Sequence, residues 1–329
     1  MKNFIRCAVF ALFVIGVTSV LWAGGAQEEK RTEEKRKTVT RYVVHATGGT
    51  AGTYFPIGGG MAELQNKYME GVKASAEVSG ASLENCRLVE KNEAQFAQAN
   101  ASAVYMAYYG KEPFKQELKN IRAVMSMHPS FIQFVVFKES GITTFEDLKG
   151  KKVNVGPPGG STFVSSWDLL KTYGFKEDDI NAVYLTFADA VTAMKDGNLD
   201  CAVVSSSIPN PAVTDLSVTR NIRLLEAKEE VLDKLIEKYP YYSKAKIPGG
   251  VYKGVDYEIW AMSVMNVVIC NKDLEEQFVY DSLKLWFDHK DYLLDVHPII
   301  RYMTLETAPN VPIPLHPGAE RFFKEKGTL

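Results

Sequence analysis

Two glycine-rich turns carry the residue types with the clearest capacity for binding chemistry. One spans residues 156–162 (GPPGGST) and follows an apolar run at 152–155; the other spans residues 47–55 (TGGTAGTYF) and follows an apolar run at 41–46. Each turn stands between a strand-like run and a helix-like pattern, with Ser161 or Thr162 placed to cap the second helix. A helix start of this kind offers outward N–H groups and favours negative charge. The sequence therefore predicts two anion-binding turns that face each other across a cleft.

The alternative is that both turns are ordinary connections, because glycine-rich turns are common in α/β proteins and most bind nothing. Neither turn has the Gly-Lys-Ser/Thr of a phosphate-binding loop or the spacing of a dinucleotide fingerprint. The motifs His-Glu-x-x-His, Gly-x-Ser-x-Gly and Cys-x-x-Cys are missing from the sequence, and its 5 histidines lack metal-ligand spacing. We expect no catalytic residue, no metal and no cofactor.

Length and charge narrow the class of protein further. The chain has 329 residues, enough for two domains, and 46% of them are hydrophobic, as in an ordinary globular protein. The formal net charge of −2 supplies no basic field for nucleic acid or an anionic membrane. We expect no nucleic-acid partner.

Residues 1–23 have the pattern of a cleavable signal peptide. Lys2 and Arg6 form a positive start, residues 7–21 are apolar, and Ala23 provides a small residue for cleavage. The alternative is an uncleaved N-terminal anchor, for which this run is short. We expect an exported protein that is cleaved near Ala23.

Residues 24–38 are interpreted as a charged linker, because they offer little to bury; a short exposed helix with Glu–Lys pairs is the alternative. Three cysteines follow, Cys86, Cys201 and Cys270, and they fit neither a disulfide framework nor a zinc site. Buried free thiols are the favoured interpretation, and one bridge among them stays open.

From residue 41 onward, strand-like and helix-like segments alternate, which predicts an α/β fold with largely parallel strands. The expected strands are 41–46, 71–78, 121–127, 131–137, 152–156, 181–187, 200–204, 221–225 and 257–270. The expected helices begin near 57, 82, 163, 188, 231, 274 and 316. Long β-rich runs at 131–137 and 257–270 would cross between two lobes, with lobe 1 formed by 39–137 and 245–329 and lobe 2 by 138–244. Such a hinged pair of lobes encloses a natural cleft for a small ligand.

Five motifs occur together in order, at 47–59, 79–85, 147–159, 196–200 and 315–320. In combination they resemble the TAXI family, the TRAP-associated extracytoplasmic solute-binding proteins. The resemblance implies a two-lobed periplasmic-binding-protein fold of the type II kind. It also implies periplasmic capture of an organic anion or amino acid, notably glutamate, glutamine or a C4–C5 dicarboxylate. Delivery would be to the membrane subunits of a TRAP permease, driven by an ion gradient without ATP.

We expect the ligand to be held by hydroxyl groups and backbone N–H groups from both lobes. The candidate ligand-binding residues are Thr50, Gly52, Thr53, Tyr54, Ser82, Asn85, Gly159, Gly160, Ser161, Thr162, Ser206 and Ser207. Three of them have a structural alternative: Tyr54 as a core aromatic residue, Ser82 as a helix cap, and Asn85 as a loop fastener. The predicted function is that of a monomeric solute receptor. The alternatives are an exported hydrolase-like or deaminase-like enzyme on the same fold and a ligand-presenting partner of a membrane sensor.

Overall fold

The computed structural model describes residues 40–329. The predicted signal peptide and charged linker lie outside the described residues. Within 40–329, ten strands form one sheet with the order β2-β1-β3-β10-β4-β7-β5-β6, and β8 and β9 pair with β4 and β10. No helix in this part of the chain is both long and apolar enough to span a bilayer.

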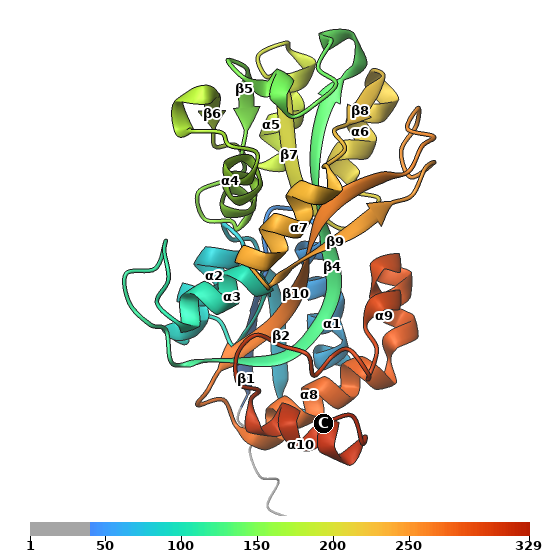
Figure 1. Ribbon diagram of the computed structural model, residues 1–329. Coiled ribbons are helices and arrows are strands. Elements are labelled where there is room, and N and C mark those ends of the chain that lie inside the picture. The colour runs from blue at the N-terminus through green and yellow to red at the C-terminus, as the bar shows by residue number, and fades with distance from the viewer. Residues whose placement is uncertain (1–39) are drawn as a thin grey trace, which may run out of the picture. The chain divides into compact units, whose positions relative to one another are not determined.

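Two groups of parallel strands form the ends of the sheet (Figure 1). The first group and its helices are β1 (Arg41–Ala46), α1 (Tyr54–Tyr68), β2 (Val72–Glu77), α2 (Ser82–Glu90), β3 (Phe96–Asn100) and α3 (Ala101–Tyr108). The second group and its helices are β5 (Lys152–Asn154), α4 (Thr162–Thr172), β6 (Asn181–Val183), α5 (Phe187–Lys195), β7 (Cys201–Ser206) and α6 (Pro211–Thr219). In both groups a strand is followed by a helix, as the alternating sequence pattern predicts.

Two long strands join the two groups. They are β4 (Ile121–Phe137) and β10 (Ile259–Asn271), which pair with each other antiparallel. One half of β4 pairs with β10, and the other half pairs with β7 and with β8 (Ile222–Leu224). One half of β10 pairs with β3, and the other half with β9 (Tyr242–Ile247). Both strands run through the molecule in Figure 1, so the predicted crossing strands are present.

The expectation of largely parallel pairing is wrong for this central part of the sheet. The strands β4, β8, β9 and β10 pair antiparallel with their neighbours, because each crossing strand returns the chain in the opposite direction. The two runs predicted at 121–127 and 131–137 are also one continuous strand. Pro129 is tolerated inside it because the pairing register with β10 shifts just beyond the Met265–Pro129 pair, and prolines in sheets are found at such irregularities.

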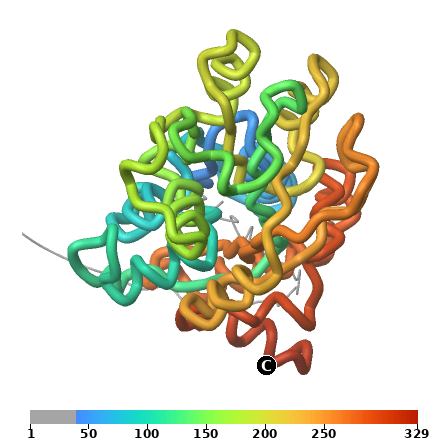
Figure 2. The backbone as a smooth tube through the Cα atoms, turned by 45° about the horizontal axis from the view of Figure 1, so that its top comes forward, coloured from blue at the N-terminus to red at the C-terminus, as the bar shows by residue number. Residues whose placement is uncertain are grey.

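The C-terminal segment covers one face of the first strand group. It comprises α8 (Glu276–Asp288), α9 (Lys290–Val296), a 3₁₀ turn (Pro298–Tyr302) and α10 (Pro317–Glu325). Trp286 of α8 is fully buried, with its ring 5.2 Å from Phe96 of β3 and in the same apolar cluster as Ile57 of α1. The C-terminus itself lies at the edge of the molecule in Figure 2.

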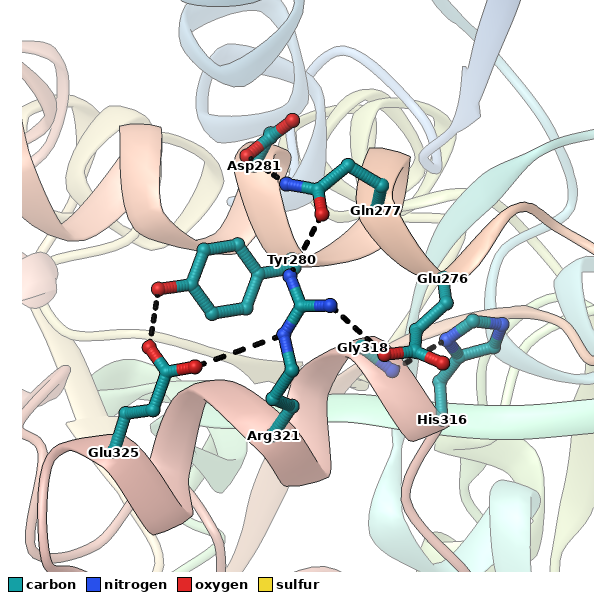
Figure 3. A network of polar contacts seen from close by, with 8 residues as sticks. All are labelled: Glu276, Gln277, Tyr280, Asp281, His316, Gly318, Arg321 and Glu325. Atoms are coloured by element: carbon teal, nitrogen blue, oxygen red, sulfur yellow. Dashed lines mark hydrogen bonds and ion pairs between the residues drawn. The ribbon is translucent and has the colours of Figure 1, made fainter.

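Helix α10 docks on α8 through a polar network (Figure 3). The Arg321 guanidinium donates to Glu276 and to Gln277, each at 2.9 Å, and lies over the Tyr280 ring at 4.1 Å. His316 caps α10 by accepting from the Gly318 N–H. A Cβ at Gly318 would lie 2.2 Å from the Glu276 carbonyl oxygen, so glycine allows the two helices to approach. The last motif of the family resemblance, at 315–320, thus serves helix packing.

The sequence patterns missed β3, α3, α6, β9 and α9 as elements. Helix α6 carried a readable signal, because Asn210 accepts from the N–H groups of Ala212 and Val213 and Pro211 occupies the first helical position. The three cysteines in the described chain are buried and free, so the favoured interpretation is confirmed and the open disulfide is excluded. Helix α7 (Glu229–Lys238) forms as predicted.

Candidate ligand-binding site

The starts of α1, α2, α4 and α5 converge on one cavity of about 310 Å³. Its lining comes from the turns before these helices and from strand residues: Gly48–Tyr54, Val78–Ser82, Pro157, Gly160–Thr162, Thr186–Ala188, Asn100, Ser130, Ser205 and Ser206. The two predicted turns therefore face the same space. Because helix N-termini carry partial positive charge, their convergence favours an anionic group in the cavity.

The turn between β5 and α4 shows why the sequence has glycine there. Gly156 adopts φ +98°, and a Cβ on it would lie 2.6 Å from the Thr162 Cβ. Glycine is the residue that tolerates both conditions, so the chain turns tightly into the helix. The first intrahelical bond of α4 runs from the Ser165 N–H to the Ser161 carbonyl. The N–H groups of residues 162–164 precede it and have no acceptor within the helix.

On one side of the cavity, Thr53 joins the turn before α1 to the end of β7. Its Oγ1 lies 2.7 Å from the Ser206 Oγ and 2.5 Å from the Ser207 Oγ. Asn210 donates to the Ser206 Oγ at 3.0 Å and to the Ala51 carbonyl at 3.2 Å. The two groups of strands and helices are thus in direct polar contact at this side of the cavity.

On the other side, Ser161 donates a hydrogen bond to the Asn100 Oδ1 and lies 3.3 Å from the Ser82 Oγ. Asn100 in turn donates to the Asn266 Oδ1 at 3.1 Å. Tyr54 donates to the same Oδ1 at 2.5 Å, and burial raises the pKa of this phenol well above its usual range. The Tyr54 hydroxyl therefore stays protonated and keeps this hydrogen bond at any physiological pH.

Asn266 anchors this network to both crossing strands. Its Nδ2 donates to the His128 carbonyl at 2.8 Å and to the Ser130 Oγ at 2.9 Å. Burial lowers the pKa of His128 to about 4, so its imidazole is neutral near pH 7. The network places neutral polar groups beside the cavity, where hydroxyl and amide atoms can hydrogen-bond a ligand.

The structure brings most of the predicted site residues together around the cavity. Those that line it are Thr50, Gly52, Thr53, Tyr54, Ser82, Gly160, Ser161, Thr162 and Ser206. Ser207 lies behind Thr53, fully buried, with its Oγ 3.5 Å from the His297 Nε2. Asn85 is fully buried and donates to the carbonyls of Thr47 and Gln98, each at 2.7 Å. Asn85 thus holds the ends of β1 and β3 together. This is the structural role that was the alternative to ligand binding for Asn85.

Two predicted helix caps are corrected by the geometry. Helix α2 begins at Ser82 itself, and Ala81, at φ 70°, occupies the cap position. Ser161 does occupy the cap position of α4, but its side chain makes no capping bond. Both hydroxyls donate to the Asn100 Oδ1 instead, so neither caps its own helix.

Several lining residues have no counterpart in the sequence predictions. Asn100 and Ser130 lie in strands, where nothing local distinguishes them from other polar strand residues. Thr186 carried a usable signal, because it accepts from the Asp189 N–H at 3.2 Å and caps α5 at the cavity. A Thr-x-x-Asp pattern before an apolar helix is a recognised N-terminal signature.

Other surface features offer weaker candidates. A larger depression of about 580 Å³ lies between the start of β2 and α8, where Arg41 is paired with Glu275 at 2.6 Å and stacked on Phe278. It lies far from the converging helix starts and is lined by charges of both signs. Within residues 40–329, no group of His, Cys, Asp and Glu is arranged to hold a metal ion.

Comparison with known proteins assigns the chain to a family. Residues 45–327 match the model of the NMT1-like family, and the protein belongs to that family. This match spans both groups of strands and helices and includes every lining residue of the cavity.

Solved structures with a similar fold share little sequence with this chain. One, from work on glutathione import via GshT and the cystine ABC importer TcyBC of Streptococcus mutans, is 14% identical with a TM-score of 0.50, covering 81% of this chain and 98% of the other. An ATP-bound Xanthomonas citri protein is 10% identical with a TM-score of 0.50, covering 86% and 94%. The alkanesulfonate-binding protein SsuA from Xanthomonas axonopodis pv. citri is 15% identical with a TM-score of 0.49, covering 82% and 86%. The chain has a mixed α/β fold, which it shares with the two structures at a TM-score of 0.50.

Proposed function

We propose that this protein is an extracytoplasmic solute-binding receptor that captures a small carboxylate or acidic amino acid between two lobes. Lobe 1 comprises 39–137 and 245–329, and lobe 2 comprises 138–244. The lobes close on the ligand, and the closed receptor delivers it to an ion-gradient-driven TRAP permease.

One observation carries the proposal: the cavity of about 310 Å³ lies where helix starts from both lobes converge. Its volume suits a small molecule. The N–H groups at the starts of α1 and α4 would bind a carboxylate, since helix N-termini favour anions. The hydroxyls of Thr53, Ser161 and Ser206 would fix its orientation, each already held by a partner within 3.5 Å.

The type of membrane transporter that receives the ligand is a separate part of the proposal. The motifs that resemble the TAXI family support a TRAP permease and periplasmic export of a monomer. The alternative is an ABC importer, because one of the similar structures comes from work on glutathione import through the cystine ABC importer TcyBC. Transport by reconstituted membranes under an ion gradient without ATP would favour the TRAP permease; a strict ATP requirement would favour the ABC importer.

The primary test is thermal unfolding of residues 24–329 with a panel of amino acids and dicarboxylates. The protein is first unfolded and refolded to strip any carried ligand. A ligand at a hundred times its dissociation constant adds about 2.7 kcal/mol to the free energy of unfolding. We expect an upward shift of the unfolding temperature by a few degrees with one compound or a small set. No shift with any member would contradict a carboxylate or amino-acid receptor.

The site itself is tested by Ser161→Ala, which removes a hydroxyl that lies between Asn100 and Ser82 at the cavity. We expect affinity for the identified compound to fall about tenfold, the loss typical of one buried hydrogen bond of about 1.4 kcal/mol. The matched control is Ser217→Ala, a buried serine of α6 outside the cavity lining. Recovery of the bound compound unchanged would separate a receptor from the enzyme alternative. Equal affinity in both variants would contradict the site.

A further inference from the structure

The carbonyl group of Gly159, in the turn before α4, lies at the N-terminus of α2. It accepts from the Leu83 N–H at 3.0 Å and from the Glu84 N–H at 3.1 Å. These two N–H groups precede the first intrahelical bond of α2, which runs from Asn85 to Ala81. A carbonyl oxygen from one proposed lobe thus occupies the anion-favouring position of a helix in the other lobe.

We propose that Gly159 and Gly80 are positioning residues that hold the cavity closed through a direct backbone contact, with the Gly159 carbonyl capping α2 in place of a ligand anion. This inference rests on the proposed two-lobed receptor function and adds to it how closure is stabilised. The α2 start then serves the contact between the lobes, and the ligand is left with the starts of α1, α4 and α5.

The α2 start is satisfied without a ligand. Besides the two bonds to Gly159, the Glu84 carboxylate accepts from the Gly80 N–H at 2.5 Å. A carboxylate in the first turn of a helix is itself favourable, because it compensates the dipole. An additional anion at this position would have to displace the Gly159 carbonyl and would meet the Glu84 charge.

The two glycines approach so closely that a side chain on Gly159 would meet the backbone of Gly80. A Cβ on Gly159 would lie 2.9 Å from the Gly80 oxygen and 3.0 Å from the Gly80 Cα. A Cβ on Gly80 would lie 3.2 Å from the Gly159 Cα. Neither residue has a positive φ, so alanine suits the backbone of each. A Cβ on Gly80 would also lie 2.4 Å from the Glu84 Oε2, so Gly159→Ala is the variant that acts on the backbone contact itself.

The contact also sets the cavity geometry. Ser161 is two residues beyond Gly159, and its hydroxyl reaches Asn100 and Ser82 only when the turn is seated on α2. Separation of the lobes would release the Leu83 and Glu84 N–H groups to water and move Ser161 away. Since the apparent affinity scales with the fraction of binding-competent protein, a weaker contact lowers affinity without touching the ligand.

The test compares Gly159→Ala with wild type in the absence of any ligand. Hydrogen exchange at the Leu83 and Glu84 amides should be at least tenfold faster in the variant, and small-angle scattering should show a larger radius of gyration. Exchange at the core strands β3 and β4 should be unchanged. Gly80→Ala is a second, milder variant, because its Cβ would lie 3.2 Å from the Gly159 Cα and 2.4 Å from the flexible Glu84 carboxylate. Exchange at the same two amides should rise, by less than in Gly159→Ala.

The control is Gly59→Ala in α1, where an added Cβ meets nothing within 4 Å. It should leave exchange at Leu83 and Glu84 and the radius of gyration as in wild type. Unchanged exchange at both amides in folded Gly159→Ala would overturn the inference. So would a uniform acceleration across the molecule, because that indicates lost stability alone. Since no ligand is added, failure of the compound panel would count against the receptor function and leave this contact standing.

Discussion

Two buried histidines show how single residues set the pH range of this fold. His45 of β1 lies 2.7 Å from the Gln65 Oε1, and His128 of β4 lies 3.1 Å from the Asn266 Nδ2. Both side chains are almost entirely shielded from solvent, and burial lowers the pKa of each to about 4. Both are therefore neutral in the folded state over most of the range in which an exposed histidine gains a proton.

This predicts acid destabilisation between about pH 6.5 and pH 4. In that window the unfolded chain binds protons at positions 45 and 128 and the folded chain does not, so stability is full above pH 6.5 and is lost as pH falls. Each histidine contributes about 2–3 kcal/mol to the loss at pH 4.5. Urea unfolding of wild type and His128→Gln at pH 7.5 and 4.5 measures it.

The variant should lose less stability between these two pH values than wild type, by about 2–3 kcal/mol. His289→Gln, a partly exposed position that stacks on Tyr68, is the control. An equal loss of stability in wild type and His128→Gln would show that His128 does not carry this pH dependence.

At the scale of elements, the close approach of α8 and α10 depends on a single missing side chain. Gly318 is buried against the Glu276 carbonyl, while His316 caps the helix and Arg321 spans to α8. Phe322 and Phe323 then enter the same apolar cluster as Trp286. The helix-start motif at 315–320 is therefore explained by the packing of α10 on α8, and it needs no ligand.

Gly318→Ala should therefore destabilise the protein although alanine favours helices. The added Cβ would meet backbone at 2.2 Å, so α10 must shift. Overpacking of this kind costs about 1–3 kcal/mol. The matched control is Gly59→Ala in the interior of α1, which should gain about 0.5–1 kcal/mol from helix propensity. Chemical unfolding of both variants measures the difference, and equal stability would refute the packing role.

At the scale of the whole described chain, β4 and β10 join the two strand groups, because β10 pairs with β3, β4 pairs with β7, and the two strands pair with each other. Their pairing register shifts between Met265 and Val267, and Asn266 at this point bonds to His128 and Ser130. A register shift weakens the ladder locally and permits bending. Asn266 also accepts from Tyr54 and Asn100 at the cavity, so a bend of the strands at this point would move side chains that line the cavity.

We expect the radius of gyration to fall when a saturating amount of the identified compound is added, because the ligand binds the closed form more tightly than the open one. The decrease should be larger in Gly159→Ala, whose ligand-free form is more open. Small-angle scattering on both proteins provides the measurement. Absence of compaction in both, at saturation, would contradict closure.

Local sequence signals determined much of the fold and a large part of the candidate site. Strand–glycine–helix patterns at 41–55 and 152–163 correctly located two turns that line the cavity, because glycine and proline act on the backbone within a few residues. The long β-rich runs correctly predicted strands that cross between the two strand groups. The wide spacing and odd number of the three cysteines correctly predicted buried free thiols.

Only the tertiary structure decided which polar groups meet. Asn100 lines the cavity because β3 ends there, and Ser130 lines it because β4 passes there. Ser161 donates to Asn100 because the fold brings the start of α4 beside the end of β3. The Gly159 carbonyl accepts from the first turn of α2, whereas its neighbours Gly160 and Ser161 line the cavity. Antiparallel pairing of β4 and β10 likewise depends on partners more than a hundred residues apart. Local patterns specify turns and periodicity; partner choice is set by packing across the chain.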